Sequence, residues 1–287
     1  MNTTTSNHIP YYDNHNKPII ASNHAKVPSI TFNVITISKD QTFKYAVTGY
    51  ESVLVLASGT VQIQVGEHIF NNVGSRADVF TGQADSVYIP LGEEAIITGI
   101  SKQAIIYAAG GKVPAPATPL PAFRIDKKDI QTVQYGSDET KTHRKIDHIL
   151  GQNVAGRVHR LLVSELFTVG EGGWSGFPPH KHDTERPPLE KYFEEVYYFR
   201  FSSPTGFAAQ FLYEEASLGP IYHVKDKSTF IIDKGYHPVV VAPGYRMYYF
   251  TILAGKHDRS LIQYFHPDQK DQLETIPGIK DMISAFK

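Results

Sequence analysis

The sequence predicts an all-β protein made of two domains, each a double-sheet jelly roll or a small barrel. Three observations support this prediction. The 287 residues include 17 Tyr and 16 Phe together with many Val and Ile, which favour strands over helices. Short strand-like runs recur along the chain, and turn signals separate them. Segments with helical periodicity are few, and possible helices are confined to the chain ends, for example at Ile279–Phe286.

The first part of the chain divides into an arm and an N-terminal domain. Residues 1–27 are polar and lack a clear periodicity, so we expect an arm or a partly disordered tail. The N-terminal domain is predicted over residues 28–110. Its expected strands are Ile30–Ile37, Ser52–Leu56, Val61–Val65, Val87–Ile89, Ala95–Ile100 and Ala104–Ala108.

A proline-rich segment, residues 111–125, is the predicted connector between the domains. Four prolines lie within residues 114–121, and this density excludes a central strand or a helix. The C-terminal domain is predicted over residues 126–287. Its expected strands are Arg160–Phe167, Val196–Phe201, Ala208–Leu212, Thr229–Ile232, Val239–Ala242 and Met247–Leu253.

Two histidines near the middle of the chain are the strongest candidates for metal ligands. His180 and His182 lie two residues apart, and alternate side chains of a strand share one face. A glutamate at the start of an aromatic strand, Glu194 or Glu195, and then His237 in a Gly-x-His-Pro turn follow in the chain. Alternation sends the two glutamates to opposite faces, so only one of them can join the histidines. Three imidazoles and one carboxylate would hold a divalent cation and leave positions for substrate oxygens.

The two halves of the sequence resemble weak copies of one another. The segments that can be aligned are Glu51–Leu56 with Glu195–Arg200 and Val87–Ala95 with Phe230–Pro238. In this alignment Glu94 takes the position of His237. Because no histidine occurs between Lys26 and Glu51, the first half has no counterpart of the His180/His182 pair. We therefore expect only the C-terminal domain to bind a metal.

Composition and charge exclude several classes of function. The net charge is -1, and the 28 basic and 29 acidic residues form no stripe that would suit nucleic acid or a membrane surface. No apolar run approaches the roughly 20 residues that span a bilayer, and the first 30 residues lack the apolar stretch of a secretory signal. The absence of cysteine excludes disulfides and Cys-ligated zinc. We expect a cytoplasmic protein, and since jelly-roll edges often pair, a homo-oligomer is an open alternative to a monomer.

The segments around the candidate ligands resemble the 5-deoxy-glucuronate isomerase family of myo-inositol breakdown, whose members are bicupins. The segments that carry the resemblance are Gly173–Asp183, Glu194–Phe201 and Lys234–Val239. The similarity is strong from about Leu161 to Gly255 and looser through the first half. The resemblance implies a bicupin, with two double-stranded β-helix (jelly-roll) domains in one chain, and a metal in the second domain. It implies zinc in first place, with manganese, iron or nickel as alternatives, and the ligands His180, His182, Glu195 and His237.

The reaction that the resemblance implies is an aldose–ketose isomerisation of a sugar acid, from 5-deoxy-D-glucuronate to 5-dehydro-2-deoxy-D-gluconate. A divalent cation would polarise the carbonyl, and a general base would move a proton between adjacent carbons. Tyr197 and Tyr249 are candidate catalytic residues, and the loop acids Asp183 and Glu185 are further candidates for the base. Arg186 is the third candidate catalytic residue, since the loop Asp183–Phe193 that carries it could close as a lid and pair its guanidinium with the substrate carboxylate.

Two other functions remain open from the sequence alone. Three histidines and a glutamate also suit a cupin dioxygenase, which would consume oxygen during turnover. A non-catalytic sugar-binding bicupin would bind its ligand without converting it. Oxygen uptake and turnover therefore distinguish the three hypotheses.

Overall fold

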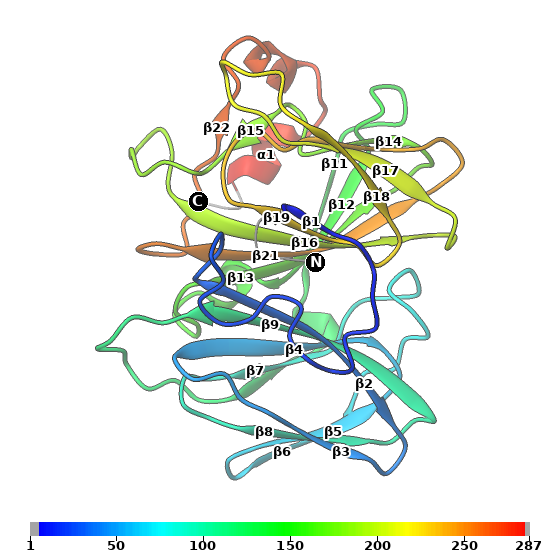
Figure 1. The fold of residues 1–287 in the computed structure, drawn as a ribbon, viewed down its shortest axis with the longest axis vertical. Coiled ribbons are helices and arrows are strands. Elements are labelled where there is room, and N and C mark those ends of the chain that lie inside the picture. The colour runs from blue at the N-terminus through cyan, green and yellow to red at the C-terminus, as the bar shows by residue number, and fades with distance from the viewer. Residues whose placement is uncertain (1–5, 285–287) are drawn as a thin grey trace.

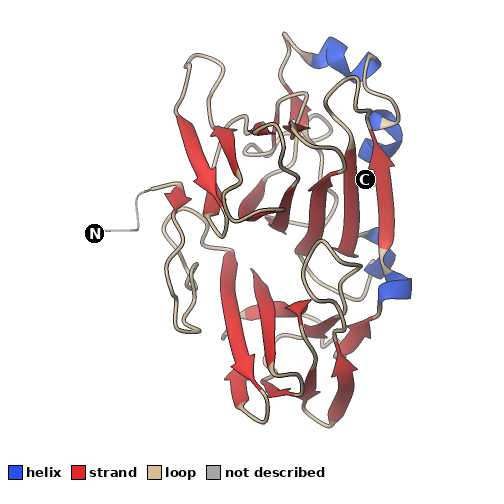
Figure 2. Cartoon of the chain, turned by 90° about the vertical axis from the view of Figure 1, so that its right-hand side faces the viewer, coloured by secondary structure: helices blue, strands red, loops and turns tan. Residues whose placement is uncertain are grey.

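A computed structural model, which describes residues 6–284, shows two β-sandwiches stacked on one another (Figure 1). The predicted all-β class is confirmed, and the few helical turns lie along one side of the molecule (Figure 2). The helical segments are 3-10 turns at Lys127–Asp129, Gln152–Val154 and Lys270–Glu274, and the α-helix α1 at Ile279–Ser284. The remainder of the predicted C-terminal helix, at residues 285–286, lies outside the described residues. No described helix is long and apolar enough to cross a membrane.

The N-terminal sandwich consists of a five-stranded sheet, in the order β10-β7-β4-β9-β2, and a four-stranded sheet, in the order β3-β8-β5-β6. Its strands are β2 (Ile30–Ser38), β3 (Thr42–Tyr45), β4 (Tyr50–Ser58), β5 (Val61–Val65), β6 (His68–Val73), β7 (Ser86–Ile89), β8 (Ala95–Gly99), β9 (Gln103–Lys112) and β10 (Phe123–Ile125). Leu54, Leu56, Val61 and Ile63 are among the aliphatic side chains that fill the space between the sheets. The interior of this domain is therefore a continuous apolar core.

The C-terminal sandwich faces a seven-stranded sheet, β1-β19-β16-β21-β13-β12-β11, with a four-stranded sheet, β14-β20-β17-β18. A short pair, β15-β22, lies at one end of the sandwich. Its strands are β1 (His8–Ile9), β11 (Gln131–Tyr135), β12 (Arg144–Leu150), β13 (Leu161–Thr168), β14 (Gly173–Ser175), β15 (His180–Lys181), β16 (Phe193–Phe201), β17 (Phe207–Phe211), β18 (Ile221–Lys225), β19 (Thr229–Ile232), β20 (Val239–Val241), β21 (Met247–Gly255) and β22 (Tyr264–Phe265). The inner face of β16 carries Tyr197 and Phe199, which pack with Val239 and Val241 of the opposite sheet.

The large sheets of the two sandwiches pack against each other through their outer faces. Phe32 of β2 lies 5.2 Å from Tyr198 and 6.0 Å from Phe250, measured between ring centroids. Arg76 and Glu165 form a buried ion pair across the same seam, with the Nη1–Oε2 distance at 2.9 Å. Both faces of β4 and β16 are therefore covered, and their residues, Glu51, Glu194 and Glu195 included, form almost unbroken buried runs.

The segment predicted to be an arm or a partly disordered tail is ordered from Ser6 onward. Strand β1 extends the seven-stranded sheet by pairing with β19. Ile20 and Val27 are fully buried in the seam between the sandwiches, and the backbone of Ile20 pairs with that of Phe32. Of the two alternatives, these contacts fit the arm, because isolated apolar residues within the polar segment fill the seam, and average composition does not register them. Residues 1–5 lie outside the described range.

The proline-rich connector is shorter than its predicted bounds of 111–125. Strand β9 continues to Lys112, and β10 returns to the N-terminal sheet, where Phe123 pairs with Tyr88 of β7. Strand β10 lies at the edge of that sheet, which is where a neighbouring proline such as Pro121 is tolerated.

Candidate metal centre and its pocket

Three imidazoles converge at one end of the C-terminal sandwich. His180 begins β15, where its backbone pairs with Phe265 of β22, and His182 follows two residues later. His237 lies in the turn between β19 and β20, after Gly235, whose φ of +87° suits a glycine. One ligand nitrogen from each histidine lies within 4.8 Å of the other two. The structure thus brings together the three histidines that the sequence singles out.

Glu195 is the glutamate that joins them. Its Oε2 atom lies 3.0 Å from His182 Nε2 and 3.3 Å from His237 Nε2. Glu194, one residue earlier in β16, points to the opposite side of the sheet and accepts hydrogen bonds from the Ser29 N–H at 2.7 Å and the Ser29 hydroxyl at 2.9 Å. The alternation of side chains along β16 therefore separates the two carboxylates into different environments.

Hydrogen bonds orient two of the imidazoles, those of His182 and His237, so that their Nε2 atoms face the Glu195 carboxylate. His182 Nδ1 lies 2.9 Å from the carbonyl oxygen of Phe193, and His237 Nδ1 lies 2.9 Å from that of Gly235. A carbonyl can only accept, so both Nδ1 atoms carry the proton and both Nε2 atoms of the neutral rings are free to bind a metal. Gln263 Nε2 lies 2.8 Å from His180 Nε2, so a cation bound to this third nitrogen would take the place of that hydrogen bond.

The charges at this centre fit a bound cation. Two acceptors, His182 Nε2 and Glu195 Oε2, repel each other at 3.0 Å unless a proton or a metal ion lies between them. Burial alone would lower the pKa of His182, but the Glu195 carboxylate raises it. Burial alone would raise the pKa of Glu195, but His182 and His237 lower it to about 2. The carboxylate therefore stays ionised, and a divalent cation that displaces the shared proton would be held by four protein atoms.

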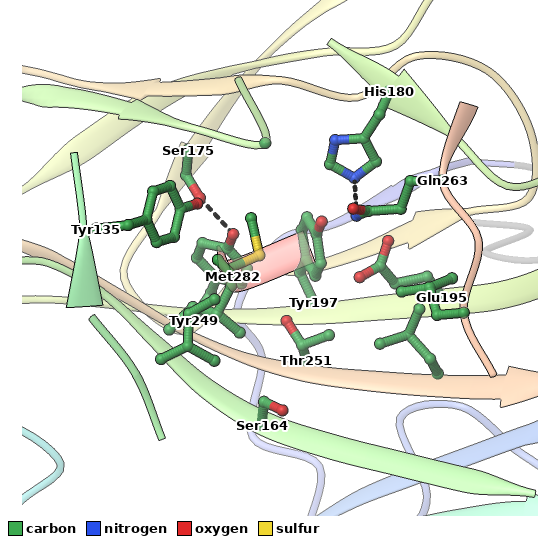
Figure 3. Close-up of a pocket in the computed structure, with 15 residues that line it drawn as sticks. Tyr135, Ser164, Ser175, His180, Glu195, Tyr197, Tyr249, Thr251, Gln263 and Met282 are labelled. Atoms are coloured by element: carbon green, nitrogen blue, oxygen red, sulfur yellow. Dashed lines mark hydrogen bonds between the residues drawn. The ribbon is translucent and has the colours of Figure 1, made fainter. Parts of the chain in front are cut away.

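Two of the candidate ligands, His180 and Glu195, line a pocket between the two sheets of the sandwich. Figure 3 shows His180, Gln263 and Glu195 at one end of this pocket and Tyr135, Ser175 and Met282 at the other, with Tyr197 and Thr251 between them. The complete lining is Tyr135, Ile146, Ser164, Leu166, Ser175, Gly176, His180, Glu195, Tyr197, Tyr249, Thr251, Leu253, Leu261, Gln263 and Met282. A small polar molecule bound at the centre would extend along the inner face of the seven-stranded sheet.

Both predicted catalytic tyrosines line this pocket. The Tyr197 and Tyr249 ring centroids are 4.4 Å apart, and the Tyr249 hydroxyl shares a short hydrogen bond with Ser175. Burial, and then the Glu195 charge, holds the pKa of Tyr197 well above its usual value, and burial also raises the pKa of Tyr249. Both phenols therefore keep their protons at neutral pH and face the pocket as hydrogen-bond donors.

The other three predicted residues lie outside the pocket lining. Arg186 pairs with Glu190, with Nη2–Oε2 at 2.7 Å, and stacks on the Tyr264 ring, 4.0 Å from its centroid. Asp183 accepts from the Gly235 N–H at 2.7 Å, which fixes the turn before His237, and Glu185 accepts from a backbone N–H of its own loop. The structure therefore gives these side chains a role in holding the loop and does not bring Arg186 to the centre.

Several pocket residues were not predicted from the sequence. Gln263 and Leu261 come from the segment that follows β21, and Met282 comes from α1. The sequence has no motif that links these residues to His180, since they lie about 80 to 100 positions away in the chain. Ser175 was within a segment that carried the family resemblance, so that segment was the available signal.

Comparison with known proteins identifies the family. The model of the KduI/IolB family matches residues 10–272. The chain belongs to the KduI/IolB family. The 5-deoxy-glucuronate isomerase of Shouchella clausii is 34% identical over 235 residues, which are 80% of this chain and 83% of that protein. The 5-deoxy-glucuronate isomerase of Geobacillus thermodenitrificans is 33% identical over 229 residues, covering 79% of this chain and 80% of the relative. The predicted resemblance is thus confirmed.

Solved structures share the fold of this KduI/IolB family member. An IolB-like protein from Salmonella typhimurium superposes with a TM-score of 0.76 at 28% identity, over 84% of this chain and 89% of that protein. The oxalate decarboxylase of Lactobacillus farciminis superposes with a TM-score of 0.61 at 12% identity, over 96% of this chain and 92% of that enzyme. The second similarity concerns the fold alone, and it confirms the predicted bicupin architecture.

Proposed function

We propose that this protein is a metal-dependent aldose–ketose isomerase that converts 5-deoxy-D-glucuronate to 5-dehydro-2-deoxy-D-gluconate in myo-inositol degradation. The observation that carries the proposal is the convergence of one nitrogen from each of three imidazoles with the Glu195 carboxylate at the end of a pocket. The relatives named 5-deoxy-glucuronate isomerase match about four-fifths of the chain, and this favours the isomerase over the other two hypotheses.

The pocket supplies the groups that this isomerisation needs. A divalent cation held by His180, His182, Glu195 and His237 would polarise the carbonyl and acidify the neighbouring carbon-bound proton. Tyr197 and Tyr249 remain protonated, so they donate hydrogen bonds to the substrate oxygens along the chain of the sugar acid. The isomerisation moves a proton from C2 to C1 and another from the C2 hydroxyl to the C1 oxygen, without a net change in atoms or electrons.

The ligand set and the domain organisation extend the proposal. We propose zinc as the cation, because three imidazoles and one carboxylate without thiolate suit zinc, although manganese, iron and nickel accept the same ligands. We propose that residues 126–287 form the metal-binding domain and residues 28–110 a metal-free one. Glu94, which aligns with His237, is exposed and pairs with Lys44 at 3.0 Å, which supports this division. A cytoplasmic location follows from the sugar-acid substrate of the proposed pathway.

Proton exchange in deuterated water tests the proposed function. The protein is incubated with 5-deoxy-D-glucuronate, and the aldehyde proton is followed by NMR while an oxygen electrode records uptake. We expect conversion to the ketose without oxygen consumption, and loss of conversion after chelation. His182→Ala should lower kcat/KM by more than about 100-fold, because even partners that only orient a ligand are worth 10- to 100-fold. The matched control is His223→Ala, since His223 is exposed on β18 and outside the pocket.

Each alternative has its own signature in this experiment. Oxygen uptake in step with substrate loss would replace the isomerase by a dioxygenase. Saturable binding of the sugar acid with no exchange at carbon would make the protein a binding module. Equal activity in His182→Ala and His223→Ala would remove the metal centre from the reaction.

A further inference from the structure

Arg144 is a buried arginine whose guanidinium makes no hydrogen bond within the part of the chain that the structure describes. It is the first residue of β12, and only 1% of its surface is exposed. Its Nε, Nη1 and Nη2 atoms all lack a hydrogen-bond partner among residues 6–284. Its contact with an aromatic side chain is with the Tyr249 ring, 5.3 Å from the guanidinium carbon to the ring centroid. A guanidinium has five N–H groups that can donate hydrogen bonds, and those of Arg144 donate none within residues 6–284.

Strand register places Arg144 on the face of the sheet that lines the pocket. It lies opposite Tyr135 in β11, and two residues before Ile146 on the same face of β12. Tyr135, Ile146 and Tyr249 are all pocket residues. The Arg144 charge also acts on the pocket tyrosines, since it opposes the effect of burial that raises the pKa of Tyr135 and of Tyr249. The guanidinium thus lies behind the end of the pocket that is far from the histidines.

The other buried arginines of the chain show how unusual this is. Arg76 has the Glu165 carboxylate, and Arg259 donates to the carbonyl oxygens of residues 150, 151 and 161. Removing a cation from water without a partner is unfavourable, and no hydrogen bond from residues 6–284 offsets this for the Arg144 side chain. An anion that enters the pocket would supply the missing acceptors, and a carboxylate matches the fork of a guanidinium in two parallel hydrogen bonds.

We propose that Arg144 is the anchor for the substrate carboxylate at the end of the pocket opposite the metal centre. The proposal rests on the proposed function for the identity of the substrate. Its geometry follows a line of side chains from Arg144 to the histidines. Tyr249 lies next to Arg144, Tyr197 lies 4.4 Å from Tyr249, and His237 lies 6.2 Å from Tyr197, each between ring centroids.

This arrangement fits a linear sugar acid whose two ends carry different chemistry. The aldehyde and its neighbouring hydroxyl lie at the histidine end, and the carboxylate lies at the Arg144 end. The intervening hydroxyls pass the two phenols, which donate to them. The same charge that is unpaired in the free protein thereby selects uronates over neutral aldoses of equal length.

Substrate charge tests this assignment. The variant Arg144→Met keeps a side chain of similar length without the guanidinium, and its kinetics are measured with 5-deoxy-D-glucuronate and with the uncharged 6-amide of the same sugar. We expect KM for the acid to rise by at least about 30-fold, the lower bound for removing one partner of a buried charge pair. We expect a much smaller change for the amide, and partial rescue in Arg144→Lys, which keeps the charge but not the fork.

A matched control separates anchoring from folding. Arg157→Met also removes an arginine from an aromatic ring, with the guanidinium carbon 3.7 Å from the Phe123 centroid, but this residue is exposed and outside the pocket. It should leave both KM values unchanged. Thermal unfolding without substrate should show Arg144→Met melting no lower than the wild type, because the variant removes an unpaired buried charge.

The outcomes distinguish the anchor from the isomerase activity. The proposed role of Arg144 is wrong if Arg144→Met still prefers the acid to the amide. It is also wrong if KM rises equally for both substrates and the variant melts at a lower temperature. Neither outcome bears on the isomerase activity of the wild type. If the wild type does not isomerise the acid, titration calorimetry with D-glucuronate replaces the kinetics. Binding that Arg144→Met abolishes would then support the anchor alone, and binding that persists would overturn it.

Discussion

The two sandwiches have the same sheet framework but differ in what fills them. In the N-terminal sandwich, Ser52 of β4 lies between Ile89 of β7 and Gly110 of β9. In the C-terminal sandwich, Glu195 holds the same place, between Ile232 of β19 and Leu253 of β21. The positions of the candidate ligand Glu195 and of Tyr197 correspond to Ser52 and Leu54, so a small and an aliphatic side chain replace them in the other domain. A jelly roll therefore needs only a few polar substitutions on its inner face to become a binding site.

The match between β4 and β16 also corrects the alignment of the two halves that was made from the sequence. Glu51 aligns by register with Glu194, and not with Glu195 as the sequence alignment suggested. Both Glu51 and Glu194 face the seam between the sandwiches, where Glu51 accepts the N–H groups of residues 159, 160 and 161. Side chains alternate along a strand, so a shift of one residue exchanges the inner face for the seam. The alignment of Glu94 with His237 agrees with the register, because Ile89 and Ile232 hold matching positions.

The largest expected effect comes from making the C-terminal sandwich more like its neighbour at one position. Glu195→Ser introduces the residue that occupies the matching site of β4. It removes a direct ligand, so we expect loss of the bound metal and a fall in kcat/KM of more than about 100-fold. Atomic emission measures the metal content, and steady-state kinetics measure kcat/KM. The control is Glu194→Gln, which is one residue away but faces the seam, and its metal content should not change. Equal loss of metal in Glu195→Ser and Glu194→Gln would contradict the comparison of the two sandwiches.

A cavity in the N-terminal core should affect stability and leave the metal in place. Leu54 is fully buried and matches Tyr197 by register. Leu54→Ala should lower the free energy of unfolding by about 2–5 kcal/mol, since it leaves a cavity among aliphatic side chains. Tyr197→Phe keeps the ring volume, so its stability should change little while kcat/KM falls. Denaturant unfolding and kinetics separate the two effects, and a metal loss in Leu54→Ala would show that the domains are not independent in function.

Acid should destabilise the C-terminal sandwich through His148. Burial lowers its pKa to about 4, and it shares a hydrogen bond with the Ser164 hydroxyl, with Nδ1–Oγ at 2.9 Å. The unfolded chain protonates this histidine near pH 6.5 and the folded chain only near pH 4, so stability is lost as pH falls between these values, by about 3 kcal/mol at most. The N-terminal sandwich offers no such group, because its one histidine, His68, is exposed.

The contribution of His148 is measured from the free energy of unfolding of the metal-free protein at pH 7 and at pH 5. The variant His148→Asn should lose part of the acid sensitivity, and His68→Asn should retain all of it. An unchanged pH dependence in His148→Asn would assign the acid sensitivity to other groups.

The sequence was sufficient for the grouping of the candidate ligands and for the class of fold because both depend on local patterns. The spacing of His180 and His182 and the alternation along β16 determine which side chains share a face. The ordered arm, Gln263 and Arg144 were not predictable in this way, because their roles depend on contacts with residues distant in the chain. The assignment of Arg186 to the substrate carboxylate came from its loop position, and the structure shows that Glu190 neutralises this side chain instead.

Anomalous X-ray scattering from a crystal of the active protein tests the metal centre most directly. Data collected on both sides of the zinc absorption edge locate zinc without reference to activity. The expected result is one peak per chain, about 2.0–2.2 Å from the Nε2 atoms of the three histidines and from a Glu195 oxygen. A fully active crystal with no peak from any divalent metal at this place, or with its peak in the N-terminal sandwich, would contradict the account.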